Sequence, residues 1–454
     1  MKLHTDTQWF RSSDGAHLLA GSPLTSFTVT DAGAEVLNAI ETGADLPPRH
    51  EHLTQRLLAT GAVHPETNSD VPLNNITVVI PAYITNETED ERLRNLVATL
   101  HGVDIIVVDD ASPLPVTRLP VRLISHQENR GPAAARNSGL HEATTSIVAF
   151  IDADARATTE DLQRLASVLH TPKVVLAAPR ITTRSNGSRI DEYEALRSPL
   201  NLGAQDAVVR PLSRVSYVPS TVLVADADAL RTLGGFDESL RYGEDVDLVW
   251  RVVESGSLVR YVASIECEHE SRASWLQFLR QRWHYGSSAA GLDRKHPYTA
   301  SPLRAHALLL LLAVTVLSGY LYAALFFMVP VCAFFVLTLR STKVSVRSRI
   351  TIAWTGFVST LRLLALAVRR AWWPLFIICS FFSVRVTAMY TFAVFTPLMF
   401  GILREKPRFV FSYVGLRLLD DLAYGAGVWA GVLKRRSVRC LLPVITFRRT
   451  SPRK

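Results

Sequence analysis

Three short apolar segments, each followed at once by polar residues, constrain the fold of this chain more than any other feature. The apolar segments are 76–80, 105–108 and 147–151, and the residues that follow them are Pro81-Ala82-Tyr83, Asp109-Asp110 and Asp152-Ala153-Asp154. Helical patterns at 91–100 and after Gly131 separate the segments. Strands that alternate with helices predict a parallel α/β sheet. Such sheets bind ligands at the carboxyl ends of their strands.

Two aspartates follow the third segment directly, in Asp152-Ala153-Asp154. Aspartates are rarely buried without a partner. A divalent cation bound to a diphosphate is one such partner, because hard cations take oxygen ligands. Gly131-Pro132 begins a predicted helix that carries Arg136 one turn in, and helix N-termini and arginines both favour phosphate. These residues predict a nucleotide site; the alternative for Arg136 is a solvated helix face.

A second acidic pair, Glu244-Asp245, begins an amphipathic helix that continues through Arg251. The helix dipole favours ionised carboxylates at this end, and an ionised carboxylate suits a general base. The alternative for Asp245 is a capping carboxylate without chemistry. Two later residues also have a structural alternative: His269 as a structural histidine, and Trp283 as a packing or interfacial side chain.

Charge and hydropathy divide the chain near Asp293. Up to that residue there are 26 Lys and Arg against 38 Asp and Glu, and after it 23 against 3. The basic residues flank apolar segments and do not alternate with exposed aromatic residues, so we expect a membrane partner and no nucleic acid. Four cysteines without a CxxC motif fit a reducing compartment. The N-terminus has no signal-peptide pattern, so we expect the catalytic part on the cytoplasmic face of the cell membrane.

Two apolar segments, 305–339 and 371–403, are each long for one membrane crossing of about 20 residues and short for two. The residues between them, 340–370, include seven Lys and Arg and no acidic residue. One crossing per segment would place these charges outside, against the positive-inside rule. Two helical hairpins would keep them cytoplasmic, with Arg385 at a turn. Interfacial or re-entrant insertion is the alternative, and 352–368 has the pattern of an interfacial amphipathic helix.

The opening 70 residues form a separate predicted unit. Short strands at 18–20 and 27–30, helices at 31–40 and 52–60, and a glycine near the end of each helix predict a small winged-helix-like module. Packing and peptide recognition are equally compatible with it. We expect three domains, with boundaries at 1–70, 71–295 and 296–454.

Six motifs occur in order between residue 76 and about residue 285: VVIPAY, VVDDAS, GPAAARNSGL, FIDADA, LGGFDE and YGEDVDLVWR. In this order they resemble the inverting family 2 glycosyltransferases, which implies a GT-A fold and transfer from a nucleotide sugar. The resemblance implies that Pro81, Tyr83 and Asp110 hold the uracil and ribose of a UDP-sugar. It also implies that Arg136 approaches the diphosphate and that Asp152 contacts the ribose or a metal-bound water.

The same resemblance implies a metal site and an acceptor site. Asp154 would coordinate Mn²⁺ or Mg²⁺, His269 would complete the metal site, and Asp245 would be the base that deprotonates the acceptor hydroxyl. The acceptor side would be lined by Gly234, Gly235, Phe236, Glu244 and Trp283. Processive members carry Gln-x-x-Arg-Trp, but Leu279 stands at the glutamine position before Arg282-Trp283. We therefore expect one addition or a few.

The opening module resembles the PqqD-like peptide-recognition fold in DGAHLLAGSPL, FTVTDAGAEVL and LLATGAVHP. Joined to this transferase and to a basic apolar tail, it resembles the glycosyltransferase family of mycofactocin biosynthesis. That implies transfer of glucose from UDP-glucose to a redox cofactor derived from a ribosomal peptide, with the acceptor held by residues 1–70. A lipid or polysaccharide acceptor is one alternative. A non-catalytic, peptide-binding membrane scaffold is another; the presence of Asp110, Asp152, Asp154 and Asp245 argues against it.

Overall fold

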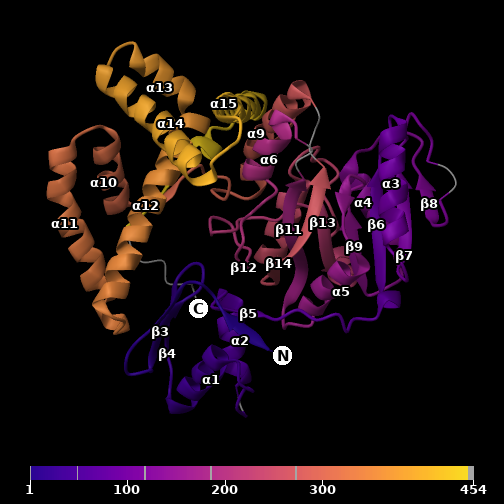
Figure 1. Cartoon of the computed structure of the whole chain (residues 1–454), viewed down its shortest axis with the longest axis horizontal. Coiled ribbons are helices and arrows are strands. Elements are labelled where there is room, and N and C mark those ends of the chain that lie inside the picture. The colour runs from indigo at the N-terminus through magenta and orange to yellow at the C-terminus, as the bar shows by residue number, and fades with distance from the viewer. Residues whose placement is uncertain (1, 49, 117–118, 185–186, 271–273, 448–454) are drawn as a thin grey trace.

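The computed structural model describes residues 2–48, 50–116, 119–184, 187–270 and 274–447 of the chain. Figure 1 shows three parts: a small module that contains α1 and α2, a central sheet flanked by helices, and a group of helices that includes α10 to α15. The module lies below the other two parts in this view.

The opening module consists of short strands and two helices. β1 (Leu3–Thr5) pairs with β5 (Val63–Pro65), and β2 (Trp9–Arg11), β3 (His17–Ala20) and β4 (Thr25–Thr28) form an antiparallel sheet. The helices α1 (Asp31–Thr42) and α2 (Glu51–Thr60) end at glycines with positive φ, which glycine adopts without strain. Both helices and the strands β3 and β4 were predicted. The three-residue strands are too short to leave a pattern.

Among the described residues, nine strands form the central sheet, in the order β10-β14-β11-β13-β9-β6-β7-β8 with β12 beside β14. The neighbours β9, β6, β7 and β8 are parallel, and so are β11 and β14, but β13 runs antiparallel to both of its neighbours. The predicted α/β sheet is confirmed as mostly, not wholly, parallel. Its strands are β6 (Ile76–Ala82), β7 (Asp104–Asp109), β8 (Arg122–Ser125), β9 (Ile147–Ile151), β10 (Ala155–Arg156), β11 (Val174–Arg184), β12 (Ala207–Val208), β13 (Val222–Asp226) and β14 (Leu258–Glu270).

Parallel pairing of β6, β7 and β9 brings their carboxyl ends to one edge of the sheet, as predicted. The β9 residues are all buried, so the residues that follow emerge at that edge. The predicted strand at 216–224 begins only at Val222; residues 216–221 form no strand. The helices around the sheet are α3 (Glu87–Thr99), α4 (Pro132–Glu142), α5 (Thr159–Val168), α6 (Arg189–Arg197), α7 (Ala227–Thr232) and α8 (Glu244–Glu254).

The C-terminal part consists mainly of helices. α9 (Trp275–Lys295) and α15 (Val410–Arg435) pack closely along each other: Gly286, Gly427 and Gly431 lie against backbone atoms of the partner helix, where a Cβ would collide. Two short strands, β15 (Arg304–His306) and β16 (Val444–Thr446), pair in parallel. The other helices are α10 (Ala307–Leu317), α11 (Leu321–Thr338), α12 (Val346–Arg370), α13 (Trp373–Ser380) and α14 (Val384–Glu405).

Each long apolar segment folds as two helices joined by a turn, α10 with α11 and α13 with α14. Arg385 lies at the second turn, as predicted for hairpins, and donates to the hydroxyl of Tyr320 in the first turn. Among the described residues, three helices have the length and hydropathy to cross a membrane: 321–342, 346–370 and 384–405. The segment predicted to be interfacial, 352–368, is part of the second of these. These helices indicate membrane association.

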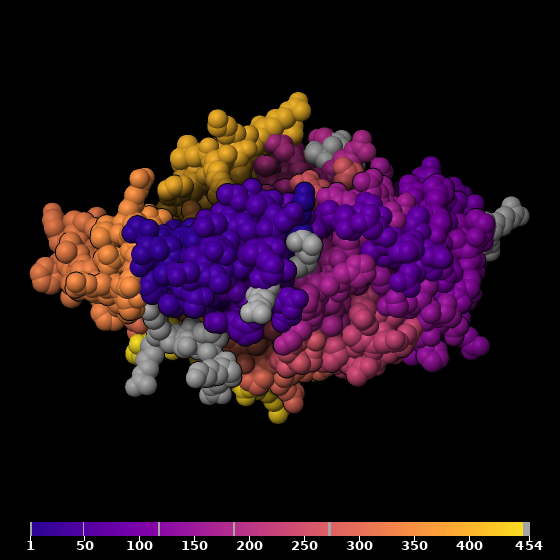
Figure 2. Space-filling model, turned by 90° about the horizontal axis from the view of Figure 1, so that it is seen from below, coloured from indigo at the N-terminus to yellow at the C-terminus, as the bar shows by residue number. Residues whose placement is uncertain are grey.

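The opening module contacts both other parts of the chain. Arg260 on β14 is 1% exposed, and its Nη2 donates to the carbonyl of Leu58 at 2.8 Å. On the opposite side, Leu19 packs against Leu339 and Val344, which flank the turn between α11 and α12. Figure 2 shows the module seated across the junction between the sheet and the orange helices. The module is therefore fixed in place by buried contacts on two sides.

Candidate active site

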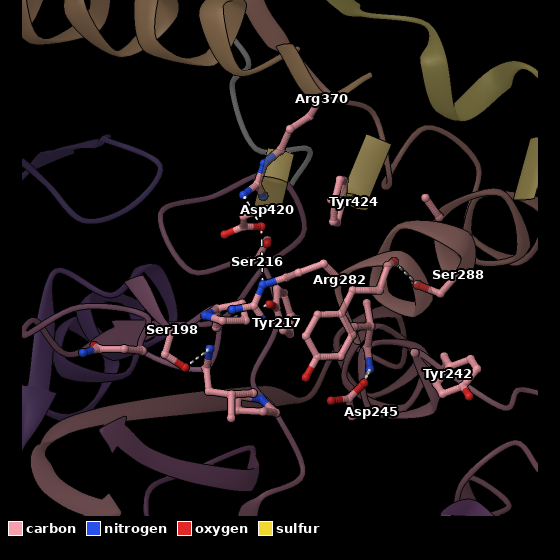
Figure 3. A pocket seen from close by; sticks show the side chains of 18 of the residues that line it. Ser198, Ser216, Tyr217, Tyr242, Asp245, Arg282, Ser288, Arg370, Asp420 and Tyr424 are labelled. Carbon is pink, nitrogen blue, oxygen red and sulfur yellow. Dashed lines mark hydrogen bonds and ion pairs between the residues drawn. The ribbon is translucent and has the colours of Figure 1, made fainter. Parts of the chain in front are cut away.

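One cleft contains most of the predicted site residues. It has a volume of about 2050 Å³ and extends from the edge of the sheet to α12, α14 and α15. Figure 3 shows Asp245 at one end of the view, Arg370 and Asp420 at the other, and Tyr217 and Arg282 between them. The predicted residues that line the cleft are Pro81, Tyr83, Asp110, Arg136, Asp152, Asp154, Glu244 and Asp245.

Asp110 is buried at the end of β7, and both of its carboxylate oxygens have partners. Oδ1 lies 2.7 Å from His126 Nδ1 and accepts from the N–H of Arg130 at 2.9 Å, while Oδ2 accepts from the N–H of Gly131 at 2.7 Å. These hydrogen bonds fix the loop that leads into α4. The sequence did not predict this role, and contact of Asp110 with a uridine stays a prediction.

Arg136 connects two acidic groups of the cleft. It is 3% exposed, its Nη2 donates to Asp152 Oδ1 at 2.7 Å, and its Nη1 donates to Glu244 Oε1 at 3.0 Å. Burial disfavours the charged form, but Asp152 and Glu244 outweigh burial and raise the pKa of Arg136. Both terminal nitrogens already have carboxylate partners. The structure therefore shows a fixed cation between Asp152 and Glu244 and not the predicted approach to a diphosphate.

Asp154 and His269 lie together, as predicted. β10 pairs with β14 so that Ala155 is opposite His269, and this brings His269 Nε2 to 3.2 Å from Asp154 Oδ2. A carboxylate oxygen with an imidazole nitrogen suits Mn²⁺, and the carboxylate alone suits Mg²⁺. Within the described ranges, no group of three or more His, Cys, Asp or Glu side chains could hold a metal. The pair could thus supply only part of a coordination shell.

Asp245 lies in the first turn of α8, as predicted, and its Oδ1 accepts from the N–H of Val246 at 2.8 Å. Burial and the neighbouring charge of Glu244 raise the pKa of Asp245 from 3.8 to about 7. The dipole argument predicted a firmly ionised carboxylate, but desolvation and like charge outweigh the dipole here. A carboxylate that titrates near neutral pH suits a general base.

Three predicted acceptor residues do not line the cleft. Gly234 and Gly235 have φ of 81° and 65°, and Phe236 is 2% exposed. The Asn137 side chain donates to the carbonyl of Phe236 and accepts from its N–H, both at 2.8 Å. A Cβ at Gly235 would collide with this side chain. The structure thus contradicts the predicted acceptor contact: the turn holds the Phe236 ring 5.3 Å beneath the Arg136 guanidinium.

Trp283 also lies outside the cleft. It is 40% exposed, in a shallow apolar groove between α9 and α15. Its neighbour Arg282 lines the cleft instead, is 2% exposed, pairs with Glu194, and places Nε 3.4 Å from Asp420 Oδ1. Adjacent residues on a helix point about 100° apart, so the two side chains face different surfaces. The prediction chose the wrong member of the Arg-Trp pair.

Sequence reasoning also missed cleft residues from distant segments. Tyr217 comes from the stretch without a strand before β13, and Tyr424 comes from α15. Arg370 ends α12 and pairs with Asp420 at 3.1 Å and with Asp421. One signal could have found this cluster: Asp420 and Asp421 are two of only three acidic residues after Asp293 in a strongly basic, apolar region.

Known proteins share these features. Residues 77–217 match the model of the family described as Glycosyl transferase family 2. A Mycobacterium tuberculosis protein named Pre-mycofactocin glycosyltransferase, recorded for strains CDC 1551 and H37Rv, is 34% identical over 454 residues, and the match covers 95% of each chain. The chain is a family 2 glycosyltransferase. Its fold is GT-A, and the resemblance based on the six ordered motifs and on the arrangement of the whole chain is confirmed.

Other relatives match this glycosyltransferase over less of its length. The Succinoglycan biosynthesis protein ExoO of Rhizobium meliloti is 27% identical over 238 residues, which is 48% of this chain and 64% of that protein. A solved mannosyltransferase from Pyrobaculum calidifontis, in complex with GDP-Man and Mn²⁺, superposes with a TM-score of 0.40 and 19% identity over 54% of this chain and 73% of its own. Because the match to the M. tuberculosis protein covers 95% of both chains, it includes most of the opening module and of the helical tail.

Proposed function

We propose that this glycosyltransferase transfers glucose from UDP-glucose to a peptide-derived redox cofactor, with a divalent metal and with inversion of the anomeric centre. The observation that carries the proposal is one cleft that contains both the Asp154 carboxylate and the candidate base Asp245, with Arg136 fixed between their segments. Similarity along nearly the whole chain to the Pre-mycofactocin glycosyltransferase supports the acceptor class. The three domains remain 1–70, 71–295 and 296–454 in this proposal.

The donor would lie at the edge of the sheet. Tyr83 is 49% exposed beside Pro81 and presents an aromatic face for a uracil, while Asp152 is available to the ribose. Asp154 and His269 would hold Mn²⁺ or Mg²⁺. The metal, when bound, would neutralise the charge that develops on the departing UDP. Arg136 keeps Asp152 oriented at 2.7 Å and limits the repulsion between this carboxylate and Glu244.

The acceptor would be activated at Asp245. Its carboxylate takes the proton of an acceptor hydroxyl, the oxygen forms the new bond to the anomeric carbon, and UDP leaves with the electrons of the broken bond. One displacement of this kind inverts the configuration. With a pKa of about 7, about half of the Asp245 carboxylates are ionised at neutral pH. The base can therefore accept and then release a proton within one cycle.

The enzyme would work at the cytoplasmic face of the cell membrane. Support comes from the three helices long enough to cross a membrane and from the seven basic residues in 340–370, which the positive-inside rule keeps cytoplasmic. The opening module resembles a peptide-recognition fold and would hold the peptide-derived acceptor. Its fixed position against β14 and the α11–α12 turn would keep that acceptor close to the cleft.

The direct test is incubation of membranes that contain the full chain with a panel of UDP-sugars and candidate acceptors, with Mn²⁺ or with a chelator. The proposal predicts a mass increase of one or a few hexoses from UDP-glucose that the chelator abolishes. Transfer only to a lipid or polysaccharide would replace the acceptor class. No turnover of any UDP-sugar, although it binds, would favour the scaffold alternative.

A further inference from the structure

The cleft is larger than its donor requires. Its volume of about 2050 Å³ is about twice the upper end of the usual range for small-molecule pockets, which is about 1,000 Å³. The donor residues line one end only. We propose that the other end, between α12 and α14, holds an apolar portion of the acceptor, so that the acceptor is an uncharged, hydroxyl-bearing amphiphile that enters from the membrane surface. This inference rests on the proposed function, because it concerns the acceptor of the same transfer.

α12 contributes an apolar stripe to this end of the cleft. Its members are spaced three or four residues apart and share one face of the helix: Trp354, Phe357, Val358, Leu361 and Ala365. Trp354 at one end of the stripe is 53% exposed, whereas Phe357 is 7% exposed, so the stripe runs from the buried interior to an open rim. A helix that crosses or lies in a membrane would bring this rim to the lipid.

α14 contributes the matching stripe. Phe392, Thr396 and Phe400 recur every four residues and line the cleft, while Phe395, on another face of the same helix, does not. Phe392 is 44% exposed and Phe400 is 67% exposed. Other side chains of the protein leave these rings uncovered, and covering them with an apolar ligand group is favourable.

The part of the cleft between Asp245 and the two stripes is polar, but its charges are paired. Arg370 pairs with Asp420 at 3.1 Å, and Arg282 pairs with Glu194. Paired groups offer hydrogen bonds to hydroxyls but no net charge to bind an anion. This lining therefore favours a sugar or another neutral hydroxyl-bearing group over a phosphate, with the apolar part of the same molecule beyond it.

The test compares methyl β-glucoside with octyl β-glucoside as acceptors, using the full chain in phospholipid nanodiscs and octyl glucoside below its micelle-forming concentration. Each buried methylene is worth about a fourfold gain in kcat/KM, so burial of two or more predicts an octyl advantage above about tenfold. Phe392→Ser and Phe400→Ser should each reduce that advantage at least about threefold. The matched control is Phe395→Ser, on the same helix and 51% exposed, which should leave the advantage unchanged. UDP-glucose hydrolysis, measured in parallel, should be the same in all four proteins.

Two results would overturn the inference while UDP-glucose hydrolysis persists. The first is no octyl advantage, or no use of either glucoside, as expected if a membrane lipid fills the groove. The second is an octyl advantage that the cleft variants and the control reduce equally or not at all, because partition of the alkyl chain into the bilayer would then explain it. Absence of UDP-glucose turnover in the wild type would instead refute the proposed function, and the inference would fall with it.

Discussion

Removal of the Glu244 charge should make the enzyme active at lower pH. Burial and Glu244 together raise the pKa of Asp245 from 3.8 to about 7, so that the rate should fall about tenfold for each pH unit below 7. In Glu244→Gln the like charge disappears, and Arg136 Nη1, now 3.0 Å from a carboxylate oxygen of Glu244, loses an anionic partner. Both changes favour the ionised form of Asp245. We expect the midpoint to move down by about one pH unit, an effect of about 1.4 kcal/mol.

The assay is kcat/KM for the acceptor between pH 5 and pH 9, at saturating UDP-glucose and Mn²⁺, because this parameter reports the pKa of the free enzyme. The wild type should have its acidic midpoint near 7, and Glu244→Gln about one unit lower. Glu238→Gln is the control, since Glu238 is 41% exposed and pairs with Arg130 and not with Arg136. A flat wild-type profile, or a Glu244→Gln midpoint equal to or above that of the wild type, would refute the reasoning.

Three further predictions concern the metal, the cleft and stability. Asp154→Asn should weaken UDP-glucose binding at least about tenfold in Mn²⁺ and little without it, measured by titration calorimetry; equal loss under both conditions would argue against a metal at the 3.2 Å pair with His269. Arg370→Met leaves Asp420 and Asp421 without this partner and should cost about 3–5 kcal/mol of unfolding free energy, whereas the exposed Arg347→Met on the same helix should cost less than about 0.5 kcal/mol. Asp245→Asn should stabilise the protein by at most about 4 kcal/mol at pH 8 and negligibly at pH 4. The sign follows because the raised pKa contributes stability below 3.8 that is lost as pH rises through about 7; an equal melting shift at both pH values would contradict it.

The parts of the site that the sequence predicted are those marked by local pattern. Asp110, Asp152 and Asp154 each follow a buried strand, and Asp245 begins an amphipathic helix, so period and position were sufficient to find them. Strand direction was not predictable in the same way. β13 has the composition of a parallel strand but runs antiparallel, since only its pairing with β9 and β11 sets its direction.

The errors arose where long-range contacts decide the role of a residue. Arg136 has the sequence context of a phosphate ligand, but Glu244, 108 residues later, occupies one of its nitrogens. Phe236 follows two glycines that look like an open acceptor loop, but Asn137 closes that turn over the core. Arg282 and Asp420 meet only because α9 and α15 pack together. Local patterns contain no information about such pairings.

The most direct test of the account compares the wild type with Asp245→Asn for two quantities on the same preparation: binding of UDP-glucose in Mn²⁺ by calorimetry, and sugar transfer by mass spectrometry. The account predicts donor binding within about threefold of the wild type and transfer reduced by at least about a thousandfold. Near-normal transfer by Asp245→Asn would contradict the assignment of Asp245 as the base, and with it the mechanism proposed for this cleft.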